Sequence, residues 1–350
     1  MMHNLNINNY AFDLPKELIA QEPMEPRDKA RLMILEPREI RHKHFYDIIN
    51  EFKKGDLILL NNSKVIPSRI YGKKRSGGKI EALLIRDMSD QMGEKNIWLV
   101  ILKGHGLRPK VEIFFNTGEN ELRGEILRWV ENGKFLVKFS SDKDVHEIIN
   151  KNGIIALPPY IKKKYNEFNM YQTVYSKIEG SIAAPTAGLH FTKSLLSQFN
   201  KKGIKIGYLT LHISASSFIP VSQENLAQSP IDPEYFTIPK ETVELYNNAT
   251  TNNSNIAVVG TTTMKAIESA CDKNGKITTT EGYSDLFIYP GYKFHSKVNK
   301  FITNFHTPKS PPLLMVSAFC GWDRLKKAYQ IAISNKYRFY SFGDAMLIIL

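Results

Sequence analysis

The most constraining feature of this sequence is a series of short β-rich segments in its first half, none of which has a helical period. Their ranges are 79–85, 96–102, 111–115, 122–130 and 134–139. Turn residues such as Gly77-Gly78 and Glu131-Asn-Gly133 separate them. Regularly spaced short strands with this punctuation predict a small β-barrel. We place the barrel at residues 68–150, inserted into a larger domain formed by residues 1–67 and 151–350.

The larger domain has a different pattern, in which apolar strands alternate with helical segments. Thr192 occupies an N-cap position, because apolar residues follow it at helical spacing as far as Gly203. This alternation predicts a layered, Rossmann-like α/β domain. The predicted strands are 32–35, 57–60, 204–213, 256–259, 286–289, 301–305 and 345–350. The predicted helices are a short one that starts at Pro15 and ends before Pro23, then 145–150, 193–201, 262–270, 313–319 and 323–335.

Length and composition narrow the class of protein. The 350 residues suffice for about two domains, and 42% hydrophobic residues are ample for a packed core. No apolar run approaches a membrane-spanning length, and residues 1–16 lack the apolar block of a signal peptide. Cys271 and Cys320 are too isolated to indicate a disulfide framework or a metal site. These features lead us to expect a reduced, cytoplasmic protein. Separately, we expect a monomer without a permanently bound cofactor.

The formal net charge of +12 has two explanations. Neutralisation of phosphates dominates nucleic-acid affinity, so the charge favours an RNA or DNA partner. The chain is also rich in Lys, Asn and Ile, as drift in an AT-rich genome would produce, and its basic clusters would then be ordinary solvated surface. These clusters are 73–75, 162–164 and Arg324 with Lys326 and Lys327.

A run of small residues, 180–192, precedes the helix at 193–201. Small side chains let backbone amides approach a ligand closely, and Pro185 fixes φ and removes a donor. The loop would present amides and His190 at the mouth of a helix, which suits a polar ligand. A tight structural loop with His190 in the core explains the pattern equally well.

Polar motifs also follow three predicted strands: Gly260 with its threonines, the segment from His212, and Asn304 to His306. Ligands bind at the carboxyl ends of strands in open α/β sheets, so His190, His212 and His306 are expected at one edge. Acid, base or donor roles are favoured over a three-histidine metal site, because paired ligand spacing is missing. The sequence has neither a nucleotide-binding glycine loop nor a nucleophile elbow.

Several segments together form a specific combination. They are Phe12-Asp-Leu-Pro with Arg27-Asp28, Leu60-Asn-Asn-Ser-Lys-Val-Ile-Pro-Ser-Arg69, Tyr171-Gln-Thr-Val-Tyr175, Ala183-Ala-Pro-Thr-Ala-Gly-Leu-His-Phe191, Val259-Gly-Thr-Thr262, Thr303-Asn-Phe-His306, Val316-Ser-Ala-Phe319 and Tyr337-Arg-Phe to Gly343-Asp-Ala-Met346. With these motifs in this order, the chain resembles the S-adenosylmethionine:tRNA ribosyltransferase-isomerase family of queuosine biosynthesis over nearly its full length.

The resemblance implies an α/β domain interrupted by a β-barrel. It also implies that S-adenosylmethionine, as co-substrate, donates its ribosyl part to the 7-aminomethyl-7-deazaguanine base at the wobble position of a tRNA anticodon. The products would be epoxyqueuosine-tRNA, adenine and methionine.

Such chemistry needs a base for the proton beside the sulfonium and an acid for the departing adenine. Groups that titrate near neutral pH suit these transfers, so His190 and His212 are the first catalytic candidates, followed by His306, Glu268 and Asp344. Lys64, Arg69 and Lys265 suit a tRNA phosphate or the methionine carboxylate. The residues for which the resemblance implies substrate binding are Asn61, Asn62, Lys64, Arg69, Pro185, Thr186, Gly188, Gly260, Thr261, Thr262, Lys265, Asn304 and Arg338.

Four motifs depart from the pattern of the family. The altered residues are Ser214 and Ser216 where glycine is common, Lys64 and Lys265 where arginine is usual, Ser229 where a histidine often stands, and Pro311 where threonine is common. Two interpretations therefore stay open: an active ribosyltransferase-isomerase, and a catalytically weakened tRNA-binding relative of the same fold. A methyltransferase is disfavoured, because no glycine-rich donor loop follows the first strand of the α/β part.

Overall fold

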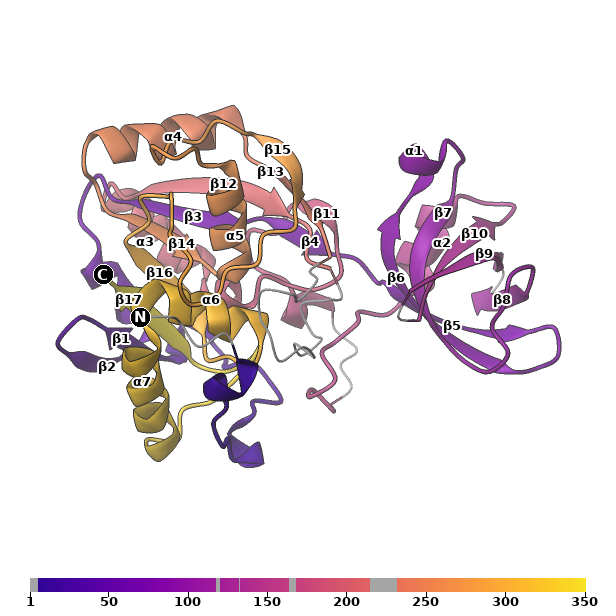
Figure 1. Cartoon of the computed structure of the whole chain (residues 1–350), viewed down its shortest axis with the longest axis horizontal. Helices are drawn as coiled ribbons and strands as arrows, with labels where there is room; N and C mark the ends of the chain where they lie inside the picture. Colours follow the sequence, from indigo (N-terminus) through magenta and orange to yellow (C-terminus); the bar gives the residue numbers. More distant parts are fainter. Residues whose placement is uncertain (1–5, 118–119, 132, 164–167, 215–231) are drawn as a thin grey trace. The chain divides into compact units, whose positions relative to one another are not determined.

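The computed structural model describes residues 6–117, 120–131, 133–163, 168–214 and 232–350. The chain forms two compact units (Figure 1). Unit 1 comprises Met1–Lys64, Pro159–Ile178 and Ala184–Leu350, and unit 2 comprises Val65–Pro158 with Glu179–Ala183. Unit 2 is thus an insertion in the chain of unit 1.

Unit 1 contains a nine-stranded mixed sheet with the strand order β15-β13-β12-β3-β14-β16-β17-β1-β2. Its four central strands, β12, β3, β14 and β16, are parallel, whereas β17 is antiparallel to β16 and parallel to β1. The predicted α/β class is confirmed, with antiparallel strands at both edges of the sheet. The strands are β1 (Arg31–Leu35), β2 (Ile40–His44), β3 (Leu57–Asn61), β12 (Lys205–Leu211), β13 (Glu234–Thr237), β14 (Ile256–Val259), β15 (Glu281–Ser284), β16 (Lys300–Asn304) and β17 (Ala345–Ile349).

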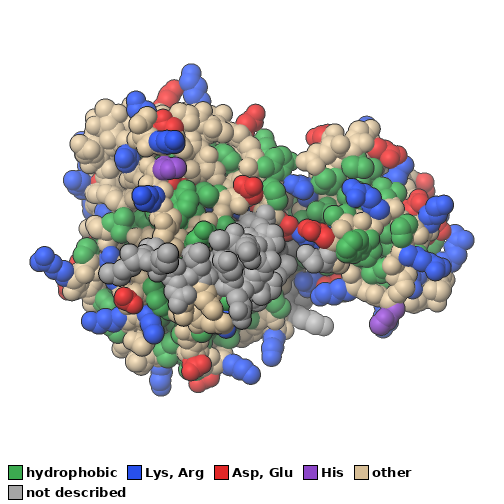
Figure 2. Space-filling model, in the orientation of Figure 1, with side chains coloured by type: hydrophobic (Ala, Val, Ile, Leu, Met, Phe, Trp, Pro, Cys, Tyr) green, Lys and Arg blue, Asp and Glu red, His purple; other side chains and the backbone are tan. Residues whose placement is uncertain are grey.

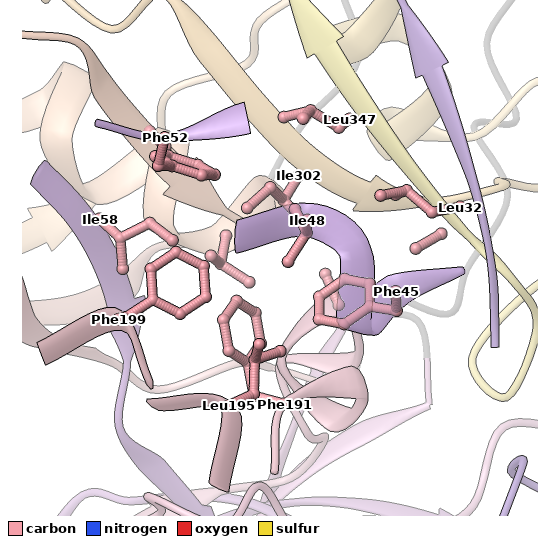
Figure 3. Close-up of a cluster of buried hydrophobic side chains, with 14 of the residues drawn as sticks. Leu32, Phe45, Ile48, Phe52, Ile58, Phe191, Leu195, Phe199, Ile302 and Leu347 are labelled. Atoms are coloured by element: carbon pink, nitrogen blue, oxygen red, sulfur yellow. The ribbon is translucent and has the colours of Figure 1, made fainter. Parts of the chain in front are cut away.

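Helical segments cover both faces of the sheet, which explains why every residue of β3, β14 and β16 is buried. On one face Ile58 and Ile302 pack with Phe45, Phe191 and Phe199 in an aromatic-rich cluster (Figure 3). The helical segments on this face are η4 (Phe45–Glu51), η6 (Thr186–His190) and α3 (Lys193–Lys201). The other helical segments of the unit are η1 (Ile7–Tyr10), η2 (Lys16–Leu18), η3 (Arg27–Lys29), η5 (Phe168–Tyr171), α4 (Lys240–Thr251), α5 (Thr261–Ala270), α6 (Pro311–Cys320) and α7 (Trp322–Ser334).

Local capping chemistry sets where these helices begin. The Thr192 hydroxyl accepts a hydrogen bond from the Leu195 amide at 3.1 Å, so the predicted N-cap of α3 is confirmed. Ser310 caps α6 and Pro311 occupies its first turn, where a missing N–H costs nothing. Gly260 precedes α5 with a φ of +87°, a conformation that favours glycine.

Unit 2 contains a closed six-stranded antiparallel barrel in the order β10-β7-β6-β5-β8-β9, which confirms the predicted barrel. Alternate side chains of its strands, together with Val145, Ile148 and Ile149 of α2, fill its core. The elements are β5 (Arg69–Lys74), β6 (Lys79–Asp87), α1 (Ser89–Met92), β7 (Ile97–Lys103), β8 (Glu112–Thr117), β9 (Asn120–Glu131), β10 (Lys134–Ser140) and α2 (Val145–Asn152). A separate two-stranded sheet pairs β4 (Ser63–Val65) with β11 (Ile178–Ser181).

Three expectations about local structure were wrong or incomplete. No strand forms at 286–289, where only Ile288 is fully buried and the preceding strand, β15, has already ended at Ser284. The helix expected from Pro15 is only the short η2. Strands β2, β4, β5, β11, β13 and β15 and helices α1 and α4 were not predicted. Ser216 and Ser229 lie outside the described residues. Within the described residues, no helix is long and apolar enough to span a membrane.

Candidate active site

The predicted strand-end motifs meet at one edge of the mixed sheet. The carboxyl ends of β12, β3, β14 and β16 lie at this edge, because these four strands are parallel neighbours. The amino ends of β17 and β1 lie there too, because β17 runs antiparallel to β16. The edge therefore collects residues from six segments that are far apart in the sequence.

Asn61 links three of these segments. Its side-chain amide donates to the Leu211 carbonyl at 3.0 Å and to the Thr262 hydroxyl at 3.2 Å, and its oxygen accepts from the Leu211 amide. The ends of β3 and β12 are thereby fixed to the first turn of α5. No side chain caps that turn among the described residues, so the amides after Gly260 are available to a polar ligand.

His190 is held in the protein interior by a hydrogen bond at Nε2 and by ring stacking. Asn304 accepts a hydrogen bond from the Thr186 hydroxyl at 3.2 Å, so its amide nitrogen donates to His190 Nε2 at 3.1 Å. The imidazole also stacks on Phe45, with the ring centroids 5.0 Å apart. Burial lowers the pKa of His190 to about 4, although Asp344 opposes this shift. His190 is therefore neutral at physiological pH and serves to hold the 183–191 loop.

Gly188, in the same loop, is required by a close approach. A Cβ at this position would lie 2.0 Å from the Tyr175 hydroxyl oxygen. The Gly188 amide donates to the Pro185 carbonyl at 2.8 Å, which closes the turn that begins η6. The loop also contacts the start of α5, since a Cβ at Gly260 would be 3.7 Å from that of Ala187.

His212 differs from the other two histidines because its side chain is half-buried and incompletely bonded. Its backbone amide donates to the Tyr235 carbonyl at 3.0 Å. Its Nδ1 atom is buried and has no hydrogen-bond partner among the described residues. Burial lowers the pKa of this imidazole, so the neutral form with a free lone pair predominates. Of the three histidines, His212 has the geometry of an available base.

His306 follows β16 at the same edge but is engaged locally. Its Nε2 lies 2.7 Å from the Thr303 hydroxyl, and its amide donates to the Tyr329 hydroxyl at 2.8 Å. Burial lowers its pKa to about 3. The ring therefore remains neutral and stabilises the turn after β16.

A buried ion pair lies beside His212. Lys265 Nζ is 3.1 Å from Glu234 Oε2, and both side chains are less than one-tenth exposed. The other carboxylate oxygen accepts from the Ser214 amide at 2.9 Å and from its hydroxyl at 3.2 Å. Glu234 thus connects α5 with the segment that follows His212. Ser214 does not have a positive φ, so serine is accommodated here without strain.

The remaining acidic candidates are saturated by donors. Asp344 accepts from the amides of Arg31 and Arg338 at 3.0 and 2.8 Å, and it pairs with both guanidinium groups. Glu268 accepts from the His295 and Ser296 amides and from the Tyr292 hydroxyl. Both carboxylates hold loops in place.

The other predicted binding residues of the 60–69 motif are Asn62, Lys64 and Arg69. Asn62 accepts from the Thr210 hydroxyl at 2.7 Å and anchors the chain after β3. Lys64 lies on β4, and Arg69 lies on β5 of the barrel, where its guanidinium is 3.3 Å from Glu81. No cluster of His, Cys, Asp or Glu suited to a metal occurs in the described part of the chain.

Comparisons with known proteins identify the family. A family model described as "Queuosine biosynthesis protein" matches residues 7–348. The S-adenosylmethionine:tRNA ribosyltransferase-isomerase of Acetivibrio thermocellus is 44% identical over 348 residues, which are 98% of this chain and 100% of the relative. The protein of the same name from Clostridioides difficile is 44% identical over 347 residues, again 98% and 100% of the two chains.

The chain belongs to the S-adenosylmethionine:tRNA ribosyltransferase-isomerase family. A solved structure of S-adenosylmethionine tRNA ribosyltransferase from Thermotoga maritima is similar with a TM-score of 0.54 and 33% identity. The similarity covers 99% of this chain and 100% of that one. The resemblance drawn from the motifs is thus confirmed.

Within this family site, sequence reasoning missed one central residue. Glu234 is the last residue of the altered segment 229–234, but its partners are distant in the sequence: Lys265 is 31 residues away and Ser214 precedes it by 20. The available signal was the glutamate that ends this segment, and attention went instead to the missing histidine at its start. Only the fold shows that this carboxylate is buried between Lys265, a predicted binding residue, and Ser214.

The buried histidines predict an acid-sensitive fold. The pKa of His190 is about 4 in the folded protein and about 6.5 when unfolded, so the unfolded chain binds more protons between these values. The contribution of neutral His190 is complete above pH 6.5 and is lost as the pH falls toward 4. By this linkage the unfolding free energy decreases by about 3 kcal/mol over that interval, and His306 adds to the effect.

Urea unfolding at pH 7.5 and at pH 5 measures this dependence. The His190→Asn variant serves as the comparison, because asparagine does not titrate. The variant is less stable at neutral pH but loses less stability on acidification than the parent protein. Equal losses in both proteins would contradict the assignment to His190.

Proposed function

We propose that this protein transfers and isomerises the ribosyl moiety of S-adenosylmethionine onto 7-aminomethyl-7-deazaguanine in tRNA. The products are epoxyqueuosine-tRNA, adenine and methionine. Full-length similarity to relatives of that name carries the proposal. It is supported by the motif residues that converge at one edge of the mixed sheet. We further propose that the chain acts as a monomer with domains 1–67 plus 151–350 and 68–150.

In the proposed reaction His212 removes the proton beside the sulfonium. A neutral imidazole with an unoccupied lone pair can accept this proton, and His212 has such an atom in Nδ1. The free amides at the start of α5 and the Thr261 and Thr262 hydroxyls bind polar groups of the co-substrate. His190, His306, Glu268 and Asp344, whose polar atoms are engaged within the protein, hold the surrounding loops. Lys64 and Arg69 are assigned to tRNA phosphates.

The altered motifs do not argue for an inactive relative where the structure describes them. Ser214 donates two hydrogen bonds to Glu234, and Lys265 completes the same network. Pro311 occupies a helical first turn that accepts proline. We therefore propose an active enzyme.

Mass spectrometry of products tests this function directly. The protein is incubated with S-adenosylmethionine and tRNA that carries the 7-aminomethyl-7-deazaguanine base. Free adenine together with epoxyqueuosine in the tRNA is the expected result, and tRNA with unmodified guanine at the wobble position is the control. Unchanged substrate tRNA, with a folded protein that still binds it, would overturn the activity.

A further inference from the structure

Charge is distributed unevenly over the barrel. Residues 73–79 and 103–110 contain seven Lys and Arg and no Asp or Glu. The rest of 65–158 contains nine Lys and Arg against twelve Asp and Glu. The positive charge of this unit is therefore concentrated in two short stretches, which general basicity of the chain does not explain.

The two stretches lie side by side in the structure. The first is the β5–β6 hairpin turn, in which the Lys74 amide donates to the Gly78 carbonyl and the Gly77 amide donates to the Lys74 carbonyl. The second is the loop after β7. Lys74 Nζ donates to the His105 carbonyl at 2.6 Å. Gly104 packs so tightly on the hairpin that a Cβ there would be 2.4 Å from Ile80 Cδ1. Together they form one surface, which we name the basic patch: Lys73, Lys74, Arg75, Lys79, Lys103, Arg108 and Lys110.

The basic patch is costly for the barrel itself. Lys73 and Lys79 are direct cross-strand partners, and like charges in such positions are destabilising. Lys110 adopts a φ of +67°, which is uncommon for a residue other than glycine. Two carboxylates lie at the margin, where Glu112 is 3.1 Å from Arg75 and Glu81 is 3.7 Å from Lys103. Lys73, Lys79, Arg108 and Lys110 are exposed and form no ion pair with the described residues.

An exposed aromatic side chain lies next to this charge. Tyr71 is 56% exposed and precedes Lys73 by two residues on β5, so both side chains emerge on the same outer face. The guanidinium of Arg75 lies over the Phe114 ring at 5.8 Å. Lys and Arg side chains crowd the right-hand part of the barrel in Figure 2. Basic groups with aromatic rings between them are typical of surfaces that track a single- or double-stranded RNA backbone.

We propose that the basic patch binds the phosphate backbone of the substrate tRNA, with Tyr71 in contact with a base or ribose at its edge. This inference rests on the proposed function for the identity of the RNA. The patch belongs to unit 2, whereas the reacting groups belong to unit 1. We assign the patch a role in affinity for tRNA, and none of its residues is assigned to the chemistry.

The test compares two triple variants of the full-length protein. Lys73→Gln, Lys79→Gln and Arg108→Gln remove three charges from the patch. Lys95→Gln, Lys143→Gln and Lys151→Gln remove three exposed charges from the acid-balanced part of the barrel and serve as the matched control. The Kd for substrate tRNA is measured at several KCl concentrations without S-adenosylmethionine.

The patch variant is expected to bind tRNA at least tenfold more weakly at low salt. The logarithm of the binding constant decreases linearly with the logarithm of the salt concentration. The magnitude of this slope should be smaller by roughly 2 to 3 in the patch variant, at about 0.9 for each phosphate that the variant no longer neutralises. The control variant keeps the parent slope. Tyr71→Leu weakens binding without a change in slope, because a stacking interaction is uncharged. A patch variant with the Kd and slope of the control would overturn the proposal.

Turnover separates this proposal from the proposed function. The patch variant should keep the parent kcat at saturating tRNA and the parent KM for S-adenosylmethionine, while its KM for tRNA rises. If the parent protein binds tRNA through the patch but releases no adenine, the proposed activity is refuted and the proposed tRNA-binding surface is supported. If the parent and the patch variant release adenine equally well at limiting tRNA, the proposed tRNA-binding role of the patch is refuted and the proposed activity is supported.

Discussion

Replacement of His212 with asparagine is expected to lower kcat by about 10²- to 10⁴-fold, the usual contribution of a general base. The expectation rests on the buried Nδ1, which has no partner among the described residues, and on the lowered pKa of the ring. Steady-state adenine release with saturating S-adenosylmethionine and tRNA measures the effect. The KM values should change little, because the ring is not assigned to ground-state binding.

His146→Gln is the matched control for removal of a histidine. This ring lies on the surface of the barrel and is 3.1 Å from Asp87, far in sequence from the sheet edge. Its kcat should equal that of the parent. A pH profile adds a second readout, since the acidic limb of kcat/KM should disappear in the His212→Asn variant. An unchanged kcat with an unchanged acidic limb would refute the assignment of His212 as the base.

Replacement of Lys265 with methionine is expected to destabilise the fold by about 3 to 5 kcal/mol, because it leaves the buried Glu234 carboxylate without its cationic partner. The segment after His212 is bonded to the same carboxylate through Ser214, so kcat should fall as well. Urea unfolding measures the first effect. Adenine release at a temperature where the variant is fully folded measures the second.

A second buried ion pair provides the control for this substitution. Lys300 is 3.6 Å from Asp56 at the opposite edge of the sheet, and both side chains are buried. Lys300→Met should cost a comparable free energy of unfolding, yet it should leave kcat unchanged in the folded protein. Lys265→Arg keeps the charge and should retain most of the stability. Equal kcat values for the methionine variants at positions 265 and 300 would show that the Glu234 network does not position His212.

Local patterns in the sequence were sufficient for most of the fold. Five of the six barrel strands could be predicted, because they are β-rich and bounded by turn residues, whereas β5 was missed. Thr192 could be identified because it precedes apolar residues at helical spacing. A strand was wrongly predicted at 286–289 because the composition of this segment suits a strand. In the structure no described strand pairs with it. Pairing between distant segments leaves no local trace.

For the candidate site too, local sequence patterns predicted the position of residues but not their contacts. The motifs placed His190, His212 and His306 at one edge of the sheet, and the structure brings them there. Their different states were not predictable, because they depend on burial and on partners from other elements. Asn304 forms a hydrogen bond with Nε2 of His190, whereas Nδ1 of His212 has no hydrogen-bond partner among the described residues. Only the three-dimensional structure distinguishes these two imidazoles.

The position of β17 constrains how the protein assembles during synthesis. The barrel is built from one continuous stretch, so it can close as soon as that stretch leaves the ribosome. Among the described strands, the hairpin of β1 and β2 joins the sheet through β17 alone. The carboxylate that bonds the Arg31 amide is 313 residues further along the chain. Strands β1 and β2 therefore remain unpaired with the rest of the sheet until β17, near residue 345, has been synthesised. An insertion that folds promptly on its own shortens the length of exposed chain during that interval.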